Sequence, residues 1–426
     1  MKVPVVVIGA GACGLTAALA AKDAGAEVLV LERDATPSGS TALSSGFVPA
    51  APTRFQHGDD SAEKMFLDIQ RKNHGQADAD LVRAICQASG PTIEWLADAH
   101  GVPFQLVEGF LYPGHSVERM HSVPEKTGEA LLASLLRACR DVDILCSAKV
   151  IQVSRESITF ARPDGSEESV AYDALVLACS GFGGNAAMVK EHIPEVADAL
   201  YFGHAGNQGD AVRWGTKLGA AIRDMSGYQG HGSVATPQNI LVTWALMTEG
   251  GIQVNADGQR FSNEHLGYSE QCVPVLRQPG GIAWCIYDER LHQLGMTFPD
   301  YRDAQAAGAV KRNPSLPRLE ETLESVRRYA SGGQDPFGRD FSKKPTLIPP
   351  YYCIKVTGAL FHTQGGLAVD PRARVLDATG KPLPRLFAGG GAACGISGPR
   401  AWGYLSGNGL LSAVVLGRIA GQGAAA

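Results

Sequence analysis

A glycine-rich turn follows a short apolar segment at the start of the chain. Residues 3–8 read VPVVVI, a valine-rich run typical of a parallel strand buried on both faces. The sequence GAGACG at 9–14 then matches the G-x-G-x-x-G pattern, and an alanine-rich helix is expected over 15–24, ended by Gly25. Strand, glycine turn and helix in this order predict a Rossmann-like domain that binds a dinucleotide.

Each glycine of the turn has its own expected role. Gly9 makes the tight turn, Gly11 lets the backbone approach a pyrophosphate, and Gly14 lets the helix pack closely on the strand. The helix N-terminus supplies amide donors and the positive end of a dipole. A second strand, expected over 27–31, closes in Glu32, whose carboxylate would bind a ribose and disfavour a 2′-phosphate. The glycine pattern alone leaves FAD and NAD both open.

The domain organisation follows from length and a shift in composition. A chain of 426 residues exceeds what one hydrophobic core usually supports, so we expect two domains. Aromatic, proline and charged residues rise between about 226 and 350, and the tail then returns to the style of the opening. We therefore expect a dinucleotide-binding domain of residues 1–228 and 352–426, and an inserted domain of residues 229–351.

Periodicity gives the remaining elements. We expect helices within 61–100 and over 131–139 and 410–419, and strands over 142–146, 150–154, 157–161 and 174–178. The segment 38–46 is expected to be a loop of small residues, and 311–350 a surface-exposed run of helix and loop.

Composition excludes several classes of partner. No stretch of about eighteen apolar residues could cross a bilayer. The net charge of −5 comes without a basic run, so nucleic acid is not an expected partner. The first apolar segment runs straight into the glycine turn and leaves no room for a cleavable signal peptide, so we expect a cytoplasmic protein. The nine cysteines form no CxxC pair and no zinc-like spacing, so we expect buried small side chains and no metal.

Six later segments settle the choice between FAD and NAD. They are residues 39–46, 177–184, 206–212, 257–264, 362–367 and 405–410. In this order they resemble the flavoprotein superfamily of fumarate reductase, succinate dehydrogenase and 3-ketosteroid Δ1-dehydrogenase, over nearly the whole chain. The resemblance implies an α/β protein with a Rossmann-like, glutathione-reductase-type FAD-binding domain, an inserted α+β capping domain, and a substrate pocket between them.

The resemblance also implies which residues contact FAD. Some relatives carry a histidine bonded covalently to the flavin near Ser40 and Thr41; this loop has none, so we expect non-covalent FAD. The residues expected to bind the cofactor are Gly9, Gly11, Gly14, Glu32, Arg33, Ser40, Thr41, Ser45, Gly46, Val150, Ser180, Gly181, Asp210, Gly390, Ser406, Asn408, Gly409 and Leu410.

The chain departs from fumarate reductases at the positions that handle substrate. Their proton-donating arginine corresponds to Tyr268, and the glutamate and arginine that feed it correspond to Trp244 and Met247. Their substrate-binding histidine corresponds to Phe361, and their carboxylate-clamping arginine to Tyr404. Loss of two cationic side chains removes the bidentate hydrogen bonds that fix a dicarboxylate. A fumarate-like substrate is therefore disfavoured.

The replacements resemble ketosteroid Δ1-dehydrogenases. By that resemblance Tyr404 and the backbone amide of Asn408 would polarise a carbonyl, and Tyr268 would take the α-proton while the β-hydride goes to flavin N5. Asparagine stands at 408 where the steroid enzymes tend to have glycine, which leaves the amide geometry open. A tyrosine of pKa about 10 needs nearby donors or the positive end of a helix to serve as a base. His231, retained with Thr243, is a candidate for that tuning.

The expected substrate is a small ring. Steroid dehydrogenases of this type are longer, and Trp244, Phe361 and Trp402 suggest a compact pocket. Arg400 stands in the same loop as Tyr404, and we hypothesise that it pairs with a remote carboxylate, as in a 4-oxocyclohexanecarboxylate-like substrate. Each of these residues also has a purely structural interpretation: tyrosines and histidines pack with a satisfied polar atom, and loop arginines are usually solvated.

Three functions stay open on the sequence alone. The leading hypothesis is an FAD-dependent dehydrogenase (desaturase) acting on CH–CH groups beside a carbonyl, with a small-molecule substrate and an unknown electron acceptor. The second is an ene-reductase of a conjugated acid or ketone, and the third is a non-catalytic electron-transfer flavoprotein subunit. Finally, His115, Arg119 and His121 form a polar cluster that either contributes to the pocket or lies in an exposed loop.

Overall fold

The computed structural model describes residues 2–109 and 111–426, and the chain divides into two compact units. The first unit contains the residues up to Ile193, Gly203–Tyr228 and His362–Ala426. The second contains Pro194–Phe202 and Gln229–Phe361. The segment 229–351 lies wholly within the second unit, which also takes in nine residues before it and extends to Phe361.

The first unit is built on an eight-stranded sheet with strand order β19-β20-β9-β1-β2-β6, and the β7–β8 hairpin joins it through β9. Strands β1, β2, β6, β9 and β20 run parallel where they pair. The sheet strands are β1 (Lys2–Ile8), β2 (Val28–Leu31), β6 (Asp143–Leu145), β7 (Lys149–Val153), β8 (Ser157–Ala161), β9 (Glu167–Leu177), β19 (Arg374–Leu376) and β20 (Pro382–Ala388). The buried valine run of β1 lies between β2 and β9, as expected for a central strand.

Helices and two small sheets complete the first unit. The helices are α1 (Ala12–Asp23), α2 (Gly39–Ala42), α3 (Ala62–Lys72), α4 (Ala79–Asp98), α5 (Gly128–Ala138), α6 (Ala186–His192), α7 (Asp210–Lys217) and α13 (Asn408–Ala425). The short strands are β3 (Val48–Pro49), β4 (Gln105–Leu106), β5 (Met120–Ser122), β11 (Ile222–Arg223) and β18 (Gly366–Leu367). The segment 38–46 was expected to be a loop and instead contains α2, because four small residues there complete one helical turn.

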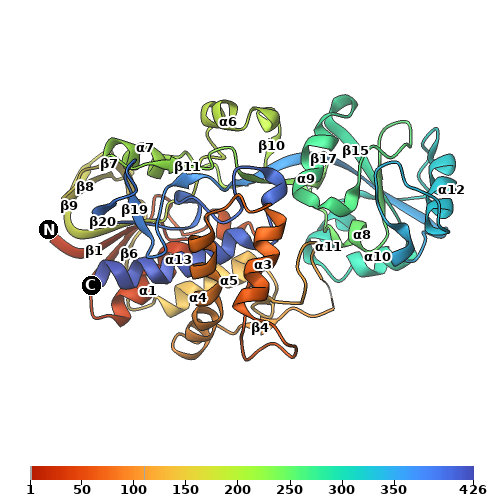
Figure 1. Ribbon diagram of the computed structural model, residues 1–426. Coiled ribbons are helices and arrows are strands. Elements are labelled where there is room, and N and C mark those ends of the chain that lie inside the picture. The colour runs from red at the N-terminus through yellow and green to blue at the C-terminus, as the bar shows by residue number, and fades with distance from the viewer. Residues whose placement is uncertain (1, 110) are drawn as a thin grey trace. The chain divides into compact units, whose positions relative to one another are not determined.

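Helices α1 and α13 lie side by side although they come from opposite ends of the sequence (Figure 1). A Cβ atom on Gly417 would come within 2.4 Å of the Cys13 carbonyl oxygen, and one on Gly421 within 2.1 Å of the Ala17 carbonyl oxygen. Glycine is therefore required at both positions for the two backbones to approach. The tail of the chain thus closes the domain that the first residues open.

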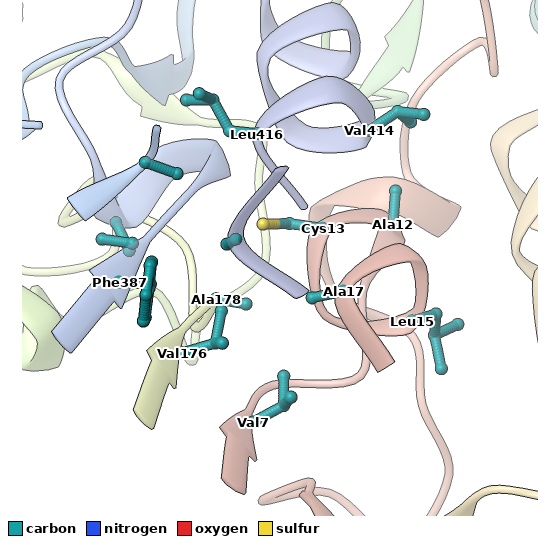
Figure 2. Packing of buried hydrophobic residues seen from close by; sticks show 14 of the residues in the cluster. Val7, Ala12, Cys13, Leu15, Ala17, Val176, Ala178, Phe387, Val414 and Leu416 are labelled. Carbon is teal, nitrogen blue, oxygen red and sulfur yellow. The ribbon is translucent and has the colours of Figure 1, made fainter. Parts of the chain in front are cut away.

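The core of this unit surrounds the contact between α1 and α13. Figure 2 shows side chains of this core, namely Val7, Ala12, Cys13, Leu15, Ala17, Val176, Ala178, Phe387, Val414 and Leu416. Seven of the nine cysteines are buried, as expected of small apolar side chains, whereas Cys146 and Cys179 are partly exposed.

The second unit is built on a seven-stranded sheet of order β13-β12-β17-β15-β14, with β10 and β16 also paired to β17. Its strands are β10 (Leu200–Tyr201), β12 (Tyr228–Ala235), β13 (Ile240–Leu241), β14 (Ile252–Val254), β15 (Ile282–Asp288), β16 (Val310–Arg312) and β17 (Tyr351–Thr363). Its helices are α8 (Ala245–Thr248), α9 (Tyr268–Leu276), α10 (Glu289–Gly295), α11 (Pro299–Ala306) and α12 (Leu319–Ala330). β12 begins and β17 ends in the first unit, so two of the four passages of the polypeptide between the units lie inside strands.

Candidate functional site

The turn between β1 and α1 has the geometry that its glycines predict. Gly9 has a φ of +105°, and a Cβ there would lie 2.6 Å from the Ala178 carbonyl oxygen. A Cβ on Gly14 would lie 1.8 Å from the Gly9 carbonyl oxygen, so no side chain fits where α1 meets the turn. The N-cap of α1 is Gly11, which has no side chain to cap the helix, and the Thr41 hydroxyl accepts the first amide of the helix, that of Ala12. Amide donors at this helix end therefore suit an anionic group such as a pyrophosphate.

Glu32 is buried and held by the same turn. One carboxylate oxygen accepts the backbone N–H of Ala10 at 2.9 Å, and the other accepts that of Asp34 at 3.0 Å. Each oxygen keeps a further lone pair for a hydroxyl donor. The carboxylate is thereby oriented at the end of β2, where a ribose was expected to bind.

The other expected cofactor residues lie on segments that hydrogen-bond around this turn. The Thr41 hydroxyl accepts the Ala12 N–H at 2.9 Å, and Ser40 of α2 accepts from the Asn207 side chain at 2.8 Å. The Arg33 guanidinium donates to the Gly206 carbonyl at 2.9 Å. Segments 32–41 and 206–207 are therefore joined directly beside the glycine turn.

The later glycines close the same region. The Gly209 N–H, at the N-cap of α7, donates to the Gly181 carbonyl at 3.0 Å. A Cβ on Gly390 would meet the Cys13 side chain at 3.3 Å. Val150 lies in β7, whose entry is fixed by the hydrogen bond from Ala148 N–H to the Glu32 carbonyl at 2.8 Å.

The remaining residues expected to bind the cofactor lie at or near the ends of other helices and strands. Ser180 follows β9, Asp210 begins α7, Ser45 and Gly46 follow α2, and Ser406 to Leu410 span the start of α13. A glycine turn that admits no side chain, a helix N-terminus with amide donors and an oriented carboxylate together fit FAD, with the pyrophosphate at α1 and the ribose at Glu32. Their assignment residue by residue is a proposal.

In the second unit four rings form what we call the aromatic wall: His231, Trp244, Tyr268 and Phe361. The His231 imidazole stacks on Tyr268 at a centroid distance of 4.7 Å and on Phe361 at 5.2 Å, and meets Trp244 edge to face at 5.8 Å. β12 supplies His231 and β17 supplies Phe361, while α8 and α9 bring in the other two rings. Four residues that lie up to 130 positions apart are thus gathered around one imidazole.

His231 is neutral, which corrects part of the expectation. Burial lowers the pKa of His231 to about 3. Its Nδ1 accepts the Ser233 N–H at 3.2 Å, so the ring hydrogen is on Nε2. A neutral imidazole stacked face to face on Tyr268 supplies no positive charge to stabilise a phenolate. His231 therefore cannot lower the pKa of Tyr268 by charge, and its Nε2–H remains a donor in the plane of the ring.

Tyr268 is the first residue of α9, after the N-cap Gly267. The positive end of a helix was the other feature expected to favour a phenolate, and Tyr268 lies at such an end. Thr243 lies beside the wall, where its hydroxyl accepts the Ala245 N–H at 3.3 Å. The Met247 carbonyl accepts from Arg339 at 3.1 Å, which is a structural contact.

In the first unit Tyr404 belongs to a segment, residues 396–408, that we call the Tyr404 loop. Tyr404 is buried, and its ring and that of His362 pack edge to face with centroids 5.4 Å apart. Trp402 stacks on His74 at 4.4 Å, so it packs within this unit. Arg400 is exposed, and no carboxylate among the described residues pairs with it. Its guanidinium therefore has no internal counter-ion in the described part of the chain.

The backbone amide of Asn408 does not match its expected role. Its N–H donates to the Leu405 carbonyl at 3.0 Å, so the turn that leads into α13 already uses this donor. The expectation that this amide polarises a carbonyl is therefore wrong for this arrangement. The next amides of the helix, those of Gly409 and Leu410, have no backbone acceptor among the described residues.

The polar cluster at 115–121 is buried, not exposed, and its side chains pair with residues from other segments. Arg119 donates to Asp68 at 2.6 Å and to Asp60 at 3.0 Å, with its side chain fully enclosed. His115 donates from Nε2 to the Ser406 carbonyl at 3.0 Å. Burial and the adjacent guanidinium lower the pKa of His115 to about 4, so His115 is neutral. Its hydrogen bond to Ser406 holds the Tyr404 loop in place. Local sequence could not reveal this role, because the acidic partners lie more than fifty residues upstream.

Comparisons with known proteins agree with this geometry. The FAD binding domain family model matches residues 4–410. The chain belongs to this FAD-binding family. It is 29% identical over 443 residues to a probable fumarate reductase of Shewanella frigidimarina, covering 99% of this chain and 74% of that protein. It is thus an FAD-dependent oxidoreductase of the flavoprotein superfamily that the sequence motifs indicated.

Two solved structures share the fold. One is the open conformation of a flavocytochrome c3 fumarate reductase, with a TM-score of 0.83 and 28% identity over all of this chain and 78% of that one. The other is 3-ketosteroid-Δ4-(5α)-dehydrogenase from Rhodococcus jostii RHA1, with a TM-score of 0.77 and 25% identity over all of this chain and 97% of that one. Across residues 2–109 and 111–426, no helix is both long and apolar enough to span a membrane.

Proposed function

We propose that this FAD-binding oxidoreductase is a dehydrogenase that introduces a C=C bond next to a carbonyl in a small cyclic ketone or keto-acid. The observation that carries the proposal is the aromatic wall, where Tyr268 begins α9 and stacks on the neutral His231. None of the four rings of this wall carries a positive charge at neutral pH, so the wall favours an uncharged ring over a dicarboxylate. Tyr268 and Tyr404 stand where fumarate reductases place arginines.

The reaction divides between two tyrosines. Tyr268, as a phenolate at the positive end of α9, removes a proton from the carbon α to the carbonyl. Tyr404 donates a hydrogen bond to the carbonyl oxygen as negative charge develops on it. Bound FAD would supply the two-electron acceptor for the hydride of the β-carbon, and loss of that hydride with the α-proton would leave a C=C bond. FAD is held without a covalent bond, since segment 38–46 contains no histidine.

The second carbonyl donor comes from the start of α13. Because the Asn408 N–H is used within the turn, the amides of Gly409 and Leu410 are the helix donors that remain for a bound group. Arg400 is exposed and unpaired, and in the proposal it binds a carboxylate on the ring, as in 4-oxocyclohexanecarboxylate. In the proposal the side chains of Trp244, Phe361 and Thr243 surround the ring of the substrate.

One finding favours a second candidate, the reverse reaction on an enone or unsaturated acid. The curated relative of Shewanella frigidimarina is a probable fumarate reductase that matches 99% of this chain. Against an acid substrate stands the replacement of both arginines by tyrosine. In this reading Tyr268 would return a proton to the α-carbon.

Assays of turnover in each direction distinguish the dehydrogenase from the reductase. Purified holoprotein would be assayed with saturated cyclic ketones and keto-acids in the presence of an electron-accepting dye, and with enones and unsaturated acids in the presence of a reduced dye. The proposal predicts faster turnover with the saturated ketones. Turnover only of unsaturated substrates would assign the protein to the reductases.

A further inference from the structure

Helix α9 contacts strand β12 closely in the second unit, because glycines lie on both sides of His231. A Cβ atom on Gly230 would lie 2.6 Å from the Cys272 Cβ, and one on Gly232 would lie 2.7 Å from the Gln271 Cβ. Neither contact falls on the flexible end of a side chain, so α9 would have to move if either glycine were replaced. The helix that begins with Tyr268 is therefore seated on the backbone beside the imidazole.

Three side chains, which we call the polar pin, connect α9 to the same strand: Ser262, Gln271 and Gln253. The Gln253 side-chain nitrogen lies 2.8 Å from the Gly232 carbonyl oxygen, and its oxygen lies 2.9 Å from the Gln271 side-chain nitrogen. The Ser262 hydroxyl lies 2.9 Å from the Gln271 side-chain oxygen and 2.6 Å from its nitrogen. Both glutamines are buried, so bulk water does not substitute for these bonds.

The backbone of β12 fixes the orientation of both carboxamides. A carbonyl oxygen only accepts, so Gln253 must present its nitrogen to Gly232. The Gln253 oxygen then faces Gln271, which must donate from its own nitrogen. The second hydrogen of the Gln253 amide points to the Cys285 sulfur at 3.3 Å. Turning either carboxamide over would place two donors or two acceptors together, so the polar pin has a single arrangement.

The first turn of α9 is tied to β12 at two points. Gln271 follows Tyr268 by three residues, within one turn of the helix. The polar pin connects Gln271 to the Gly232 carbonyl, and the Ser269 hydroxyl accepts the Gly230 N–H at 3.0 Å. These two points lie just before and just after the imidazole in the strand. Together they fix the height of the turn that carries Tyr268.

We propose that Gln271 and Gln253 are positioning residues that hold the Tyr268 ring against the His231 imidazole. The two rings are stacked with an interplanar angle of 18°. Stacked rings can slide past each other at little cost, whereas directional hydrogen bonds in a single arrangement resist such a shift. This inference deepens the proposed function and rests on it where turnover is concerned, but the position of the ring can be tested without turnover.

Nuclear magnetic resonance of holoprotein with isotope-labelled histidine tests the position directly, because a stacked aromatic ring shifts the signals of the imidazole hydrogens. The His231 signal is assigned by its loss in His231→Gln, and Tyr268→Leu shows how far it moves without the ring. Gln271→Met keeps the volume but removes the amide, and we expect it to shift the His231 signal. Gln278→Met is the control, since Gln278 lies just beyond the other end of α9 and donates to the Pro274 carbonyl. A His231 signal that moves no further in Gln271→Met than in the control would overturn the proposal.

A double-mutant cycle tests whether the pin acts through Tyr268. The signal is the rate at which 4-oxocyclohexanecarboxylate bleaches the flavin, per bound flavin, so unfolded protein does not count. Gln271→Met should slow bleaching about tenfold in the natural background, and less than about twofold in Tyr268→Phe, where the proposed base is already lost. Gln253→Met breaks the pin at its other residue and should reproduce both results.

The outcomes of this cycle separate the inference from the proposed function. Equal losses from Gln271→Met in both backgrounds would show a general disturbance of the fold and would overturn the positioning role. Bleaching of Tyr268→Phe at the natural rate, or no bleaching of the natural protein, would instead contradict the proposed function. The His231 signal would then decide by itself whether the polar pin holds the ring.

Discussion

The aromatic wall of the second unit and the Tyr404 loop of the first unit are held in place by different kinds of interaction. Rings stacked on His231 define the wall, at centroid distances of 4.7 and 5.2 Å. Directional hydrogen bonds define the loop, through His115 on one side and Ser397 on the other. Stacking tolerates small shifts, whereas a hydrogen-bonded loop loses its geometry when one partner is removed.

This difference has a chemical consequence. Each of the two tyrosines packs against a histidine, Tyr268 against His231 and Tyr404 against His362. Burial lowers the pKa of His231 to about 3 and that of His362 to about 4. Neither therefore carries charge near neutral pH. The account consequently assigns proton transfer to the tyrosine of the wall and carbonyl binding to the tyrosine of the loop.

We expect the largest loss of turnover from a substitution in the aromatic wall. Tyr268→Phe keeps the ring stacked on His231 but removes the proposed base, so turnover of a cyclic ketone should fall about 10³-fold. Tyr301→Phe is the matched control, because Tyr301 is a buried tyrosine of the same unit that hydrogen-bonds Tyr287 and His292. It should lose stability and keep turnover. Equal losses in both variants would mean that the hydroxyl of Tyr268 matters only for packing.

The wall also depends on a buried ion cluster four residues before Tyr268. Burial alone would raise the pKa of the Glu264 carboxyl, but the guanidinium groups of Arg339 and Arg260 outweigh it and hold the pKa at about 2. Glu264→Gln leaves two buried cations with less compensation and should lower the free energy of unfolding by about 3 kcal/mol.

The same carboxyl predicts how stability depends on pH. Its pKa is lower in the folded protein than the ordinary value of 4.5, so it stabilises the fold fully above pH 4.5. That contribution is lost as pH falls from about 4.5 to about 2. Urea unfolding at pH 7 and pH 3 measures it; a Glu264→Gln variant as acid-sensitive as the natural protein would contradict this assignment.

Substitution of Tyr404 in the loop should lower turnover less than substitution of Tyr268, the proposed base. Tyr404→Phe removes one donor to the developing oxyanion, and turnover should fall about 10²-fold with little change in KM. The α13 amides would continue to stabilise the oxyanion in this variant. A large rise in KM with unchanged kcat would instead make Tyr404 a ground-state binding residue.

A smaller effect is expected at the rim of the loop. Arg400→Ala should raise the KM for a cyclic keto-acid about five- to tenfold and leave the KM for the uncharged ketone unchanged, because an exposed ion pair contributes about 1 kcal/mol. Arg372, exposed elsewhere in the same unit, provides the control substitution Arg372→Ala. A KM for the acid that stays the same in Arg400→Ala would eliminate the carboxylate contact.

The smallest effect concerns the pH profile. Because His231 is neutral well above pH 3, His231→Gln should change kcat/KM without moving any pKa in the profile between pH 5 and 9. A profile whose acidic limb disappears in His231→Gln would show that the imidazole titrates in that range.

The sequence predicted the elements that are local and repeat a known spacing. The β1 valine run, the glycine turn and Glu32 lie within 32 residues, and each has one structural solution. The resemblance to the flavoprotein superfamily was confirmed by the family match. The α2 turn was missed because four small residues carry no periodicity.

What the sequence could not predict depends on contacts between distant side chains. Arg119 is buried only because Asp60 and Asp68 reach it from a separate helix region, and nothing in residues 115–121 indicates that. The use of the Asn408 amide by Leu405 depends on the shape of one turn. Likewise the neutral state of His231 follows from its depth of burial, which spacing does not specify.

Anaerobic mixing of the yellow holoprotein with a panel of small cyclic ketones and keto-acids tests the central claim most directly, with the oxidised flavin absorbance as the signal. The account predicts that a saturated cyclic ketone bleaches the flavin in the natural protein and that bleaching is about 10³-fold slower in Tyr268→Phe. No bleaching by any saturated ketone, together with reoxidation of the chemically reduced protein by an enone or unsaturated acid, would contradict it.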